Sequence, residues 1–352
     1  MRHTYLYDAH LSLGAKMGSF GEWEMPLWYS EGVSQEVKAV REDVGLFDVS
    51  HMGTFSIRGN VLGALQPLVT NDLSLVPIGK AQYTLLLNEK GGIVDDLIAY
   101  RVEEDLWNLV VNAGNRDGDW AWIRERVGKG VVMEDDSESI VLVALQGPHA
   151  AATLSELGFS SKGIPRFGLG KGEILGNLVS GARTGYTGED GFELFIPLQS
   201  AFVVWEGLIS AGARPCGLAA RDVLRLEASF PLHGQDISPR TSPLETGLEW
   251  AVKWNKGSFV GKGALLKERE EGSTRERVGI QTRIPVRFGN EVYCGEECVG
   301  RVTSGLFSPT LGHPIGLALI SRERPEGDLV VMKGGRPRKA TRVKLPFYRR
   351  KG

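Results

Sequence analysis

Hydrophobic and polar residues alternate along several short stretches of the chain, as they do in strands that bury one face. Three such stretches, Tyr83 to Leu87, Ile93 to Val102 and Leu106 to Val111, are separated by short polar turns and predict a β-meander. Thr54 to Arg58 predicts an earlier strand of this β region. Ile140 to Leu145 is apolar at every position and predicts a buried strand.

Elsewhere the hydrophobic residues recur every three or four positions, which is the period of a helix with one buried face. In the first of these segments Val33, Val37, Val40 and Val44 recur at this spacing, and Gly45 ends the predicted helix. Another begins at Gly147-Pro148 with proline at its first position, where its missing N–H costs nothing. The valine-lined segment is Ser34 to Val44, and two further helices are predicted over Asn115 to Val127 and Gly217 to Ala228.

The last part of the chain, from about Glu276 onward, contains only short alternating runs and turns. This pattern predicts a small β-barrel, and residues 268–273 are interpreted as the linker into it. With 352 residues the chain is too long for one simple core, so two or three domains are expected.

The composition gives no indication of a nucleic-acid-binding, disulfide-rich or membrane-spanning protein. The net charge of −2 gives no global indication of nucleic acid or a membrane surface as partner. Three cysteines, Cys216, Cys294 and Cys298, are too few and too odd in number for a disulfide framework, and no metal site is predicted from them. No apolar run reaches membrane-spanning length and the N-terminus has no signal-peptide pattern, so a cytoplasmic enzyme is expected.

The stretch from Arg183 to Glu193 combines three glycines, a tyrosine and three carboxylates. Gly185 and Gly188 allow the backbone to pass close to a ligand, and Tyr186 offers a flat face. Glu193 precedes an apolar run and is expected on a strand that enters the core. This combination suits a planar heterocycle that is stacked and then held at an amide-like edge. A glycine-rich turn with a solvated acidic tip is the alternative.

Asp96 is predicted to share one strand face with Ile98 and Tyr100. An acid on an apolar face is costly unless it is paired or used, and burial raises its pKa toward the range that suits proton transfer. The alternative is that Asp95 and Asp96 are solvated or bind turn amides near the hairpin. Asn112 ends the following strand and offers both a donor and an acceptor, or else it only forms a turn.

Four other side chains have alternative interpretations. Tyr83 is either a stacking surface or a core aromatic. Arg221 and Arg225 are four residues apart on a predicted helix, where like charges repel, so a bound carboxylate, Asp222 or Glu227 could relieve them. His51 has no nucleophile of the serine or cysteine type to activate, so a hydrogen-bonded structural role is expected rather than a general base.

Several well-known motifs are missing. The glycines of 168–172 lack the final spacing of a dinucleotide fingerprint, and neither a P-loop nor an HExxH occurs. The sequence therefore does not support a nicotinamide, nucleotide or zinc mechanism.

The motifs and their order resemble the aminomethyltransferase family, the T-proteins of the glycine cleavage system, over nearly the whole chain. The sequences that carry the resemblance are Phe47-Asp48-Val49-Ser50-His51-Met52-Gly53, Gly91-Gly92-Ile93-Val94-Asp95-Asp96-Leu97-Ile98, Val111-Asn112-Ala113, Leu145-Gln146-Gly147-Pro148, Arg183 to Glu193, Cys216-Gly217-Leu218-Ala219-Ala220-Arg221-Asp222 with Leu224-Arg225-Leu226-Glu227-Ala228, and Thr303 to Gly312.

The resemblance implies an α+β protein whose three domains form a cloverleaf around a central folate channel. Domain 1 would comprise 1–50 and 140–245, domain 2 would comprise 51–139 with 246–273, and the C-terminal β-barrel domain would comprise 274–352. Asp96 would be the catalytic carboxylate beside the folate nitrogens. The residues implied to bind the folate are Met52, Tyr83, Ile98, Val110, Asn112, Tyr186, Glu193, Arg221 and His233.

The implied reaction moves a one-carbon unit from the aminomethyl group on the lipoyl arm of H-protein to tetrahydrofolate, without a metal. Two other functions stay open at this point. His233 stands where many relatives have tyrosine, which leaves room for a folate-dependent demethylase of a small sulfonium or N-methyl donor. A non-catalytic folate-binding protein of iron-sulfur assembly is the other, but Ser258 replaces the cysteine of its signature in Lys256-Gly257-Ser258-Phe259.

Overall fold

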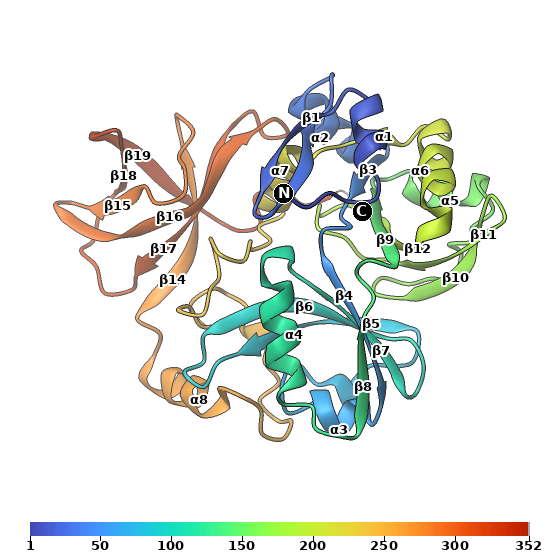
Figure 1. The fold of residues 1–352 in the computed structure, drawn as a ribbon. Coiled ribbons are helices and arrows are strands. Elements are labelled where there is room, and N and C mark those ends of the chain that lie inside the picture. The colour runs from blue at the N-terminus through green and yellow to red at the C-terminus, as the bar shows by residue number, and fades with distance from the viewer. Residues whose placement is uncertain (351–352) are drawn as a thin grey trace. The chain divides into compact units, whose positions relative to one another are not determined.

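The structure is a computed structural model that describes residues 1–350 (Figure 1). These residues form two compact units. Unit 1 comprises 1–66, 73–83 and 97–222, and unit 2 comprises 67–72, 84–96 and the described residues from 223 onward. Helices and strands are both abundant, so the predicted α+β class is confirmed. The three domain boundaries expected from the family resemblance stay a prediction.

Unit 1 contains a six-stranded sheet in the order β10-β11-β12-β9-β3-β13. Its strands are β3 (Gly45–Asp48), β9 (Ile140–Gln146), β10 (Leu169–Ile174), β11 (Asn177–Ala182), β12 (Gly191–Pro197) and β13 (Arg214–Pro215). β9 lies inside the sheet and is almost entirely buried, as expected for a strand that is apolar at every position up to its last residue.

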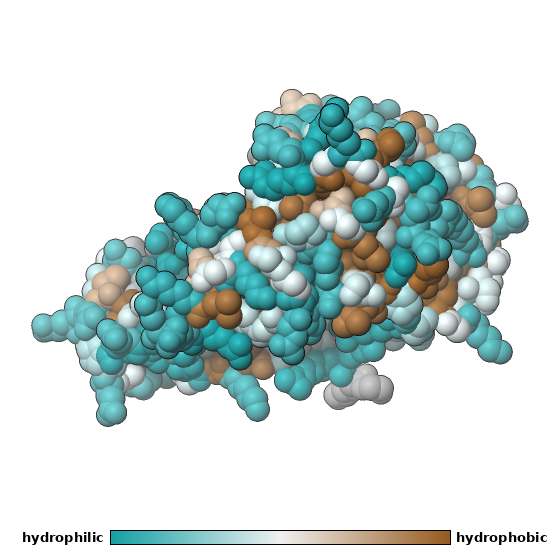
Figure 2. Space-filling view, turned by 90° about the horizontal axis from the view of Figure 1, so that it is seen from below, coloured by the Kyte–Doolittle hydropathy of each residue, from teal (hydrophilic) through white to brown (hydrophobic). Residues whose placement is uncertain are grey.

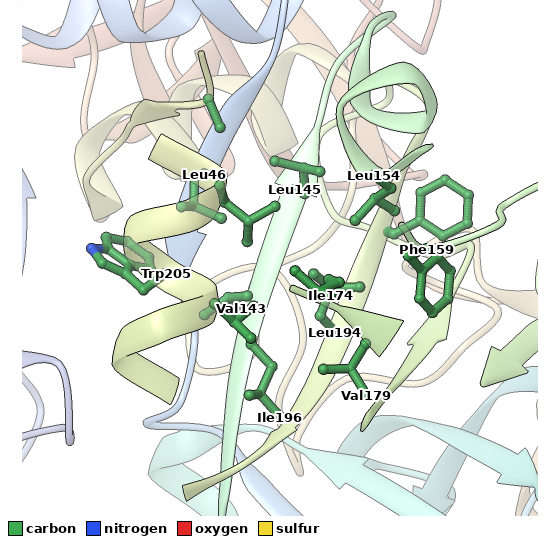
Figure 3. Packing of buried hydrophobic residues seen from close by; sticks show 14 of the residues in the cluster. Leu46, Val143, Leu145, Leu154, Phe159, Ile174, Val179, Leu194, Ile196 and Trp205 are labelled. Carbon is green, nitrogen blue, oxygen red and sulfur yellow. The ribbon is translucent and has the colours of Figure 1, made fainter. Parts of the chain in front are cut away.

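The core of this sheet is formed by side chains of β3, β9 and β12 that pack against two helices, α5 (Ala150–Glu156) and α6 (Ala201–Ser210) (Figure 3). Leu154 and Trp205 reach the sheet from these helices and are at most 1% exposed. The other helices and the strand pair of this part are α1 (Tyr7–Ser12), β1 (Lys16–Phe20), β2 (Trp23–Trp28) and α2 (Val33–Glu42). This packing fixes the ends of β9 and β12, which carry the residues described below.

A five-stranded sheet has the order β5-β6-β7-β4-β8. Its strands are β4 (Gly53–Gly59), β5 (Lys80–Leu87), β6 (Ile93–Arg101), β7 (Leu106–Val111) and β8 (Val131–Asp135), and two helices accompany it, α3 (Val61–Leu65) and α4 (Arg116–Arg124). The predicted meander is thereby confirmed. Trp120 of α4 lies edge-on to Phe55 of β4, with ring centroids 5.1 Å apart.

Unit 2 contains a closed six-stranded barrel in the order β14-β17-β16-β15-β18-β19, which confirms the predicted β-barrel. Its strands are β14 (Arg275–Thr282), β15 (Glu291–Cys294), β16 (Glu297–Ser308), β17 (His313–Ser321), β18 (Leu329–Lys333) and β19 (Arg336–Val343). The apolar side chains of alternate positions fill its interior.

The tip of the β5–β6 hairpin also belongs to unit 2. The Ile93 amide donates to the carbonyls of Ser238 and Thr241 at 3.1 and 3.0 Å. At Gly92 a Cβ would overlap the Pro239 carbonyl, so only glycine fits there. Residues that are remote in sequence therefore hold this hairpin in place.

Two local predictions are wrong. The segment 268–273 is not a linker, because α8 (Lys262–Glu271) continues through most of it and Gly272 caps its C-terminal end. The helix predicted from Gly147 begins instead at Ala150. Gly147 has φ +136° and lies so close to the Asp43 carbonyl that a Cβ would overlap it, and this approach precludes helical geometry there.

The surface carries hydrophobic residues in small patches among hydrophilic ones on the face shown in Figure 2. Within the described residues, no helix is long and apolar enough to cross a membrane.

Candidate functional site

The glycine-rich loop (residues 183–190) connects β11 to β12 and is held by the buried side chain of Gln146. Gln146 Nε2 donates to the Thr184 carbonyl at 3.1 Å. A Cβ at Gly185 would overlap Gln146 Oε1, so this glycine is needed for the close approach of Gln146 rather than of a ligand. Gly188 has φ +82°, as expected for a turn that requires glycine.

The acidic residues of this loop are not a solvated tip. Arg41 Nη1 donates to Glu189 Oε1 at 2.7 Å, and both side chains are only 6% exposed. Arg183 donates from Nε and Nη2 to the two oxygens of Asp190 at 2.9 and 2.5 Å. Two of the three carboxylates in the stretch are therefore held by arginines, which leaves Glu193 as the one with capacity for a ligand.

Glu193 lies on β12 and is oriented by two hydroxyl donors. Thr184 Oγ1 and Tyr100 Oη both donate to its Oε2, at 2.5 and 3.3 Å. Among residues 1–350 no side chain donates to its Oε1. Burial, followed by the charge of Glu193, raises the pKa of Tyr100 well above 10.0, so Tyr100 stays a hydrogen-bond donor. The carboxylate is thus pre-oriented with one oxygen available.

Tyr186 and Arg221 form a second element of the site. The Arg221 guanidinium lies over the Tyr186 ring at 4.5 Å from its centroid, within the range of a cation–π interaction. Arg221 belongs to the first part of α7 (Leu218–Glu227). The two residues combine a flat aromatic surface with a fixed positive charge.

His51 is buried near this cation. Its side chain packs edge-on against Phe20, with ring centroids 5.4 Å apart, and its Nδ1 has no hydrogen-bond partner among the described residues. Burial and then the Arg221 charge lower the pKa of His51 to about 4. His51 is therefore neutral near pH 7, and the hydrogen-bonded role expected for it is not supported at Nδ1.

Four of the predicted residues lie on, or directly next to, neighbouring strands of the five-stranded sheet. Ile98 of β6 is paired with Val110 of β7, and Val111 is paired with Gly53, the residue after Met52. Asn112 follows β7 directly. Met52, Ile98 and Asn112 are half-buried. Their side chains, two of them apolar, are therefore partly accessible from solvent.

Asp95 and Asp96 lie on opposite faces of β6 and differ in exposure. Asp96 is half-buried, like Ile98 on the same face, and Asp95 is 0% exposed. Solvation of Asp95, one of the alternatives from the sequence, is therefore wrong. Asp96 is the accessible carboxylate of the pair.

Arg225 is buried in an ion pair with Asp236. Its Nη1 donates to Asp236 Oδ2 at 2.7 Å, and its Nη2 donates to Ser304 Oγ at 2.9 Å. Asp236 also accepts from Thr303 Oγ1 at 2.5 Å. Asp236, which comes from the loop after α7, is therefore a partner of Arg225 that the sequence analysis did not name.

Tyr83 and His233 complete the predicted residues. Tyr83 is half-buried on β5. His233 is half-buried and its Nε2 lies 3.4 Å from the Ile93 carbonyl, at the start of β6. His233 and Asp96 therefore both belong to unit 2, near the same end of this strand.

Comparison with known proteins identifies the family. Residues 6–256 match the GCVT N-terminal domain, and residues 275–349 match the glycine cleavage T-protein C-terminal barrel domain. The aminomethyltransferase of Thermotoga maritima is 46% identical over 361 residues, which cover 99% of this chain and 98% of the relative. The chain belongs to the aminomethyltransferase family of the glycine cleavage system.

Other aminomethyltransferases agree with this assignment. That of Thermosynechococcus vestitus is 45% identical over 99% of this chain and 96% of its own length. The crystal structure of glycine cleavage system aminomethyltransferase T from Bartonella henselae matches with a TM-score of 0.92 and 36% identity, covering 99% of this chain and 98% of that one. These matches confirm the family resemblance and favour an aminomethyltransferase over the demethylase and the iron-sulfur assembly protein.

Proposed function

We propose that this aminomethyltransferase uses tetrahydrofolate as acceptor and the aminomethylated dihydrolipoyl arm of H-protein as donor. The transferred carbon lies between the sulfur of the arm and an amino group. When the carbon–nitrogen bond breaks, ammonia leaves and the carbon becomes electrophilic. Two folate nitrogens then bond to this carbon, the carbon–sulfur bond breaks, and the products are 5,10-methylene-tetrahydrofolate and the dihydrolipoyl thiol.

The observation that carries the folate proposal is the orientation of Glu193. Its Oε2 accepts from two protein hydroxyls, and its Oε1 accepts from no side chain of residues 1–350. The amino-pyrimidone edge of a pterin presents neighbouring N–H donors, which suit a carboxylate. Such charge-assisted hydrogen bonds are stronger than neutral ones, so Glu193 would fix the ring in one orientation.

Tyr186 and Arg221 would contribute stacking and charge to the same ligand. An aromatic ring suits the flat pterin, and a guanidinium suits the carboxylates at the other end of a folate. Met52, Tyr83, Ile98, Val110, Asn112 and His233 would line the pocket, in accordance with the family resemblance.

Asp96 would act on a folate nitrogen near the electrophilic carbon. A carboxylate there can orient or deprotonate the nitrogen and stabilise positive charge that develops on the carbon. Most of the rate enhancement would come from holding nitrogen and carbon together. The half-buried position of Asp96 on β6 supports this role.

The test is a donor comparison in the presence of tetrahydrofolate. Aminomethylated H-protein should give 5,10-methylene-tetrahydrofolate and ammonia in equal amounts. Free sulfonium and N-methyl compounds should give no product. Turnover of a free N-methyl donor without turnover of H-protein would replace this proposal by the demethylase.

A further inference from the structure

Glu36 is a buried carboxylate that the reaction described above does not use. It lies in α2 and is 1% exposed. Its Oε1 accepts from the Tyr29 amide at 2.5 Å, and its Oε2 accepts from the Gly217 amide at 2.9 Å. Burial raises the pKa of Glu36, while these two backbone bonds oppose the shift. One side chain thus joins two backbone segments that are remote in sequence.

The bond to Gly217 fixes the start of α7. Gly217 immediately precedes the helix, and its carbonyl accepts from the Arg221 amide at 3.2 Å. A Cβ at Gly217 would overlap the Leu27 carbonyl, so this backbone is tightly packed as well. Arg221 is therefore one helical turn from the amide that Glu36 holds.

The bond to Tyr29 leads to a second segment of the site. Tyr29 Oη lies 2.9 Å from His10 Nδ1, and His10 Nε2 lies 3.0 Å from Asp48 Oδ2. Asp48 Oδ1 in turn accepts from the Ser50 amide at 2.9 Å. Ser50 stands two residues before Met52. A continuous set of buried hydrogen bonds thus connects the start of α7 with the turn that precedes β4.

From this geometry we infer that Glu36 is a positioning residue for folate binding, which acts by fixing the start of α7 and through it the guanidinium of Arg221. The inference rests on the proposed function, because it takes Arg221 to bind the folate. When a side chain that contacts the ligand is displaced by a fraction of an ångström to an ångström, the affinity for the ligand falls. Glu36 itself does not contact the ligand.

The experiment is a double-mutant cycle on tetrahydrofolate affinity, measured by calorimetry. Glu36→Gln keeps the side-chain shape but directs an amide donor at one of the two backbone N–H groups. We expect it to weaken folate binding on the order of tenfold, with KM raised and kcat little changed. In an Arg221→Ala background the same substitution should change affinity less than about twofold.

A matched control is Asp135→Asn. Asp135 is a partly buried carboxylate of unit 1 that likewise accepts a backbone N–H, from Ser137 at 3.1 Å. This variant should keep wild-type folate affinity. If Glu36→Gln does not fold, Glu36→Asp serves in its place, because it keeps the charge but is one methylene shorter.

Three outcomes would overturn the inference. One is full additivity of Glu36→Gln with Arg221→Ala, which would mean that Glu36 acts on general stability. Another is wild-type affinity in both Glu36 variants. The third is wild-type affinity of Arg221→Ala, which would remove Arg221 from the site, while a folate-binding defect of a Glu193 variant would still support the proposed function.

Discussion

Replacing Glu193 by glutamine tests the folate site with little change in shape. The amide oxygen of the variant can still accept from Thr184 Oγ1 and Tyr100 Oη, which both donate to Oε2 in the protein. The amide nitrogen then takes the place of Oε1 and directs a donor at the N–H donors of the pterin edge. One charge-assisted hydrogen bond is lost, which costs about 1.5–3 kcal/mol. Folate affinity should therefore fall by roughly 10- to 100-fold.

Calorimetric titration with tetrahydrofolate under anaerobic conditions measures this loss directly. Thermal unfolding of the same sample should be close to that of the wild type, because both hydroxyl donors keep an acceptor. The matched control is Glu173→Gln, since Glu173 is an exposed residue on β10 of the same sheet. The control should bind folate normally. Wild-type affinity in Glu193→Gln would show that Oε1 does not contact the ligand.

Further predictions concern catalysis, stability and pH. Asp96→Asn should lower turnover on the order of 10²–10⁴-fold with little change in folate affinity. Asp95 is 0% exposed, so Asp95→Asn should mainly lower the unfolding temperature. Equal losses of turnover in the two variants would refute the assignment of Asp96 as the catalytic carboxylate. Asp236→Ala breaks the ion pair with Arg225, whose side chains are 2% and 0% exposed, and should lower the free energy of unfolding in urea by about 3–5 kcal/mol. Asp328→Ala breaks the exposed ion pair with Lys339 and should lower it by less than about 1 kcal/mol. Similar losses in the two variants would refute the effect of burial. His51 has a folded-state pKa of about 4 against 6.5 ordinarily, so it contributes stability above pH 6.5 that is lost as the pH falls from 6.5 to 4, by about 3 kcal/mol. His51→Gln should lack this part of the acid-side decline in a pH series of chemical unfolding, and an unchanged decline would contradict the low pKa.

The sequence predicts Glu193 and Asp96 because each interrupts an apolar strand, and such an interruption is visible locally. It does not predict how Glu193 is oriented. Tyr100 is 93 residues away from Glu193, and no local pattern connects the two. The same holds for Asp236, which occupies an ordinary loop position and becomes the partner of Arg225 only through the packing of the folded chain.

Strand predictions succeed where buried and half-buried side chains alternate along the strand, as in β6. They fail where tertiary contacts override local preference. Pro148 suits the first position of a helix, but Gly147 is held against the Asp43 carbonyl and the helix starts later. Glu36 has no local signature either, because its partner Gly217 is 181 residues away.

The tip of the β5–β6 hairpin has a consequence for biosynthesis. Ile93 is buried against backbone groups of Ser238 and Thr241, which the ribosome adds much later. At roughly 5–20 residues per second, these partners are added roughly 7–30 s after the hairpin. During that interval Leu85 and Leu87, both 0% exposed in the folded chain, lack the segment that completes their unit. The order of synthesis therefore leaves an apolar hairpin accessible to chaperones until most of the chain has been translated.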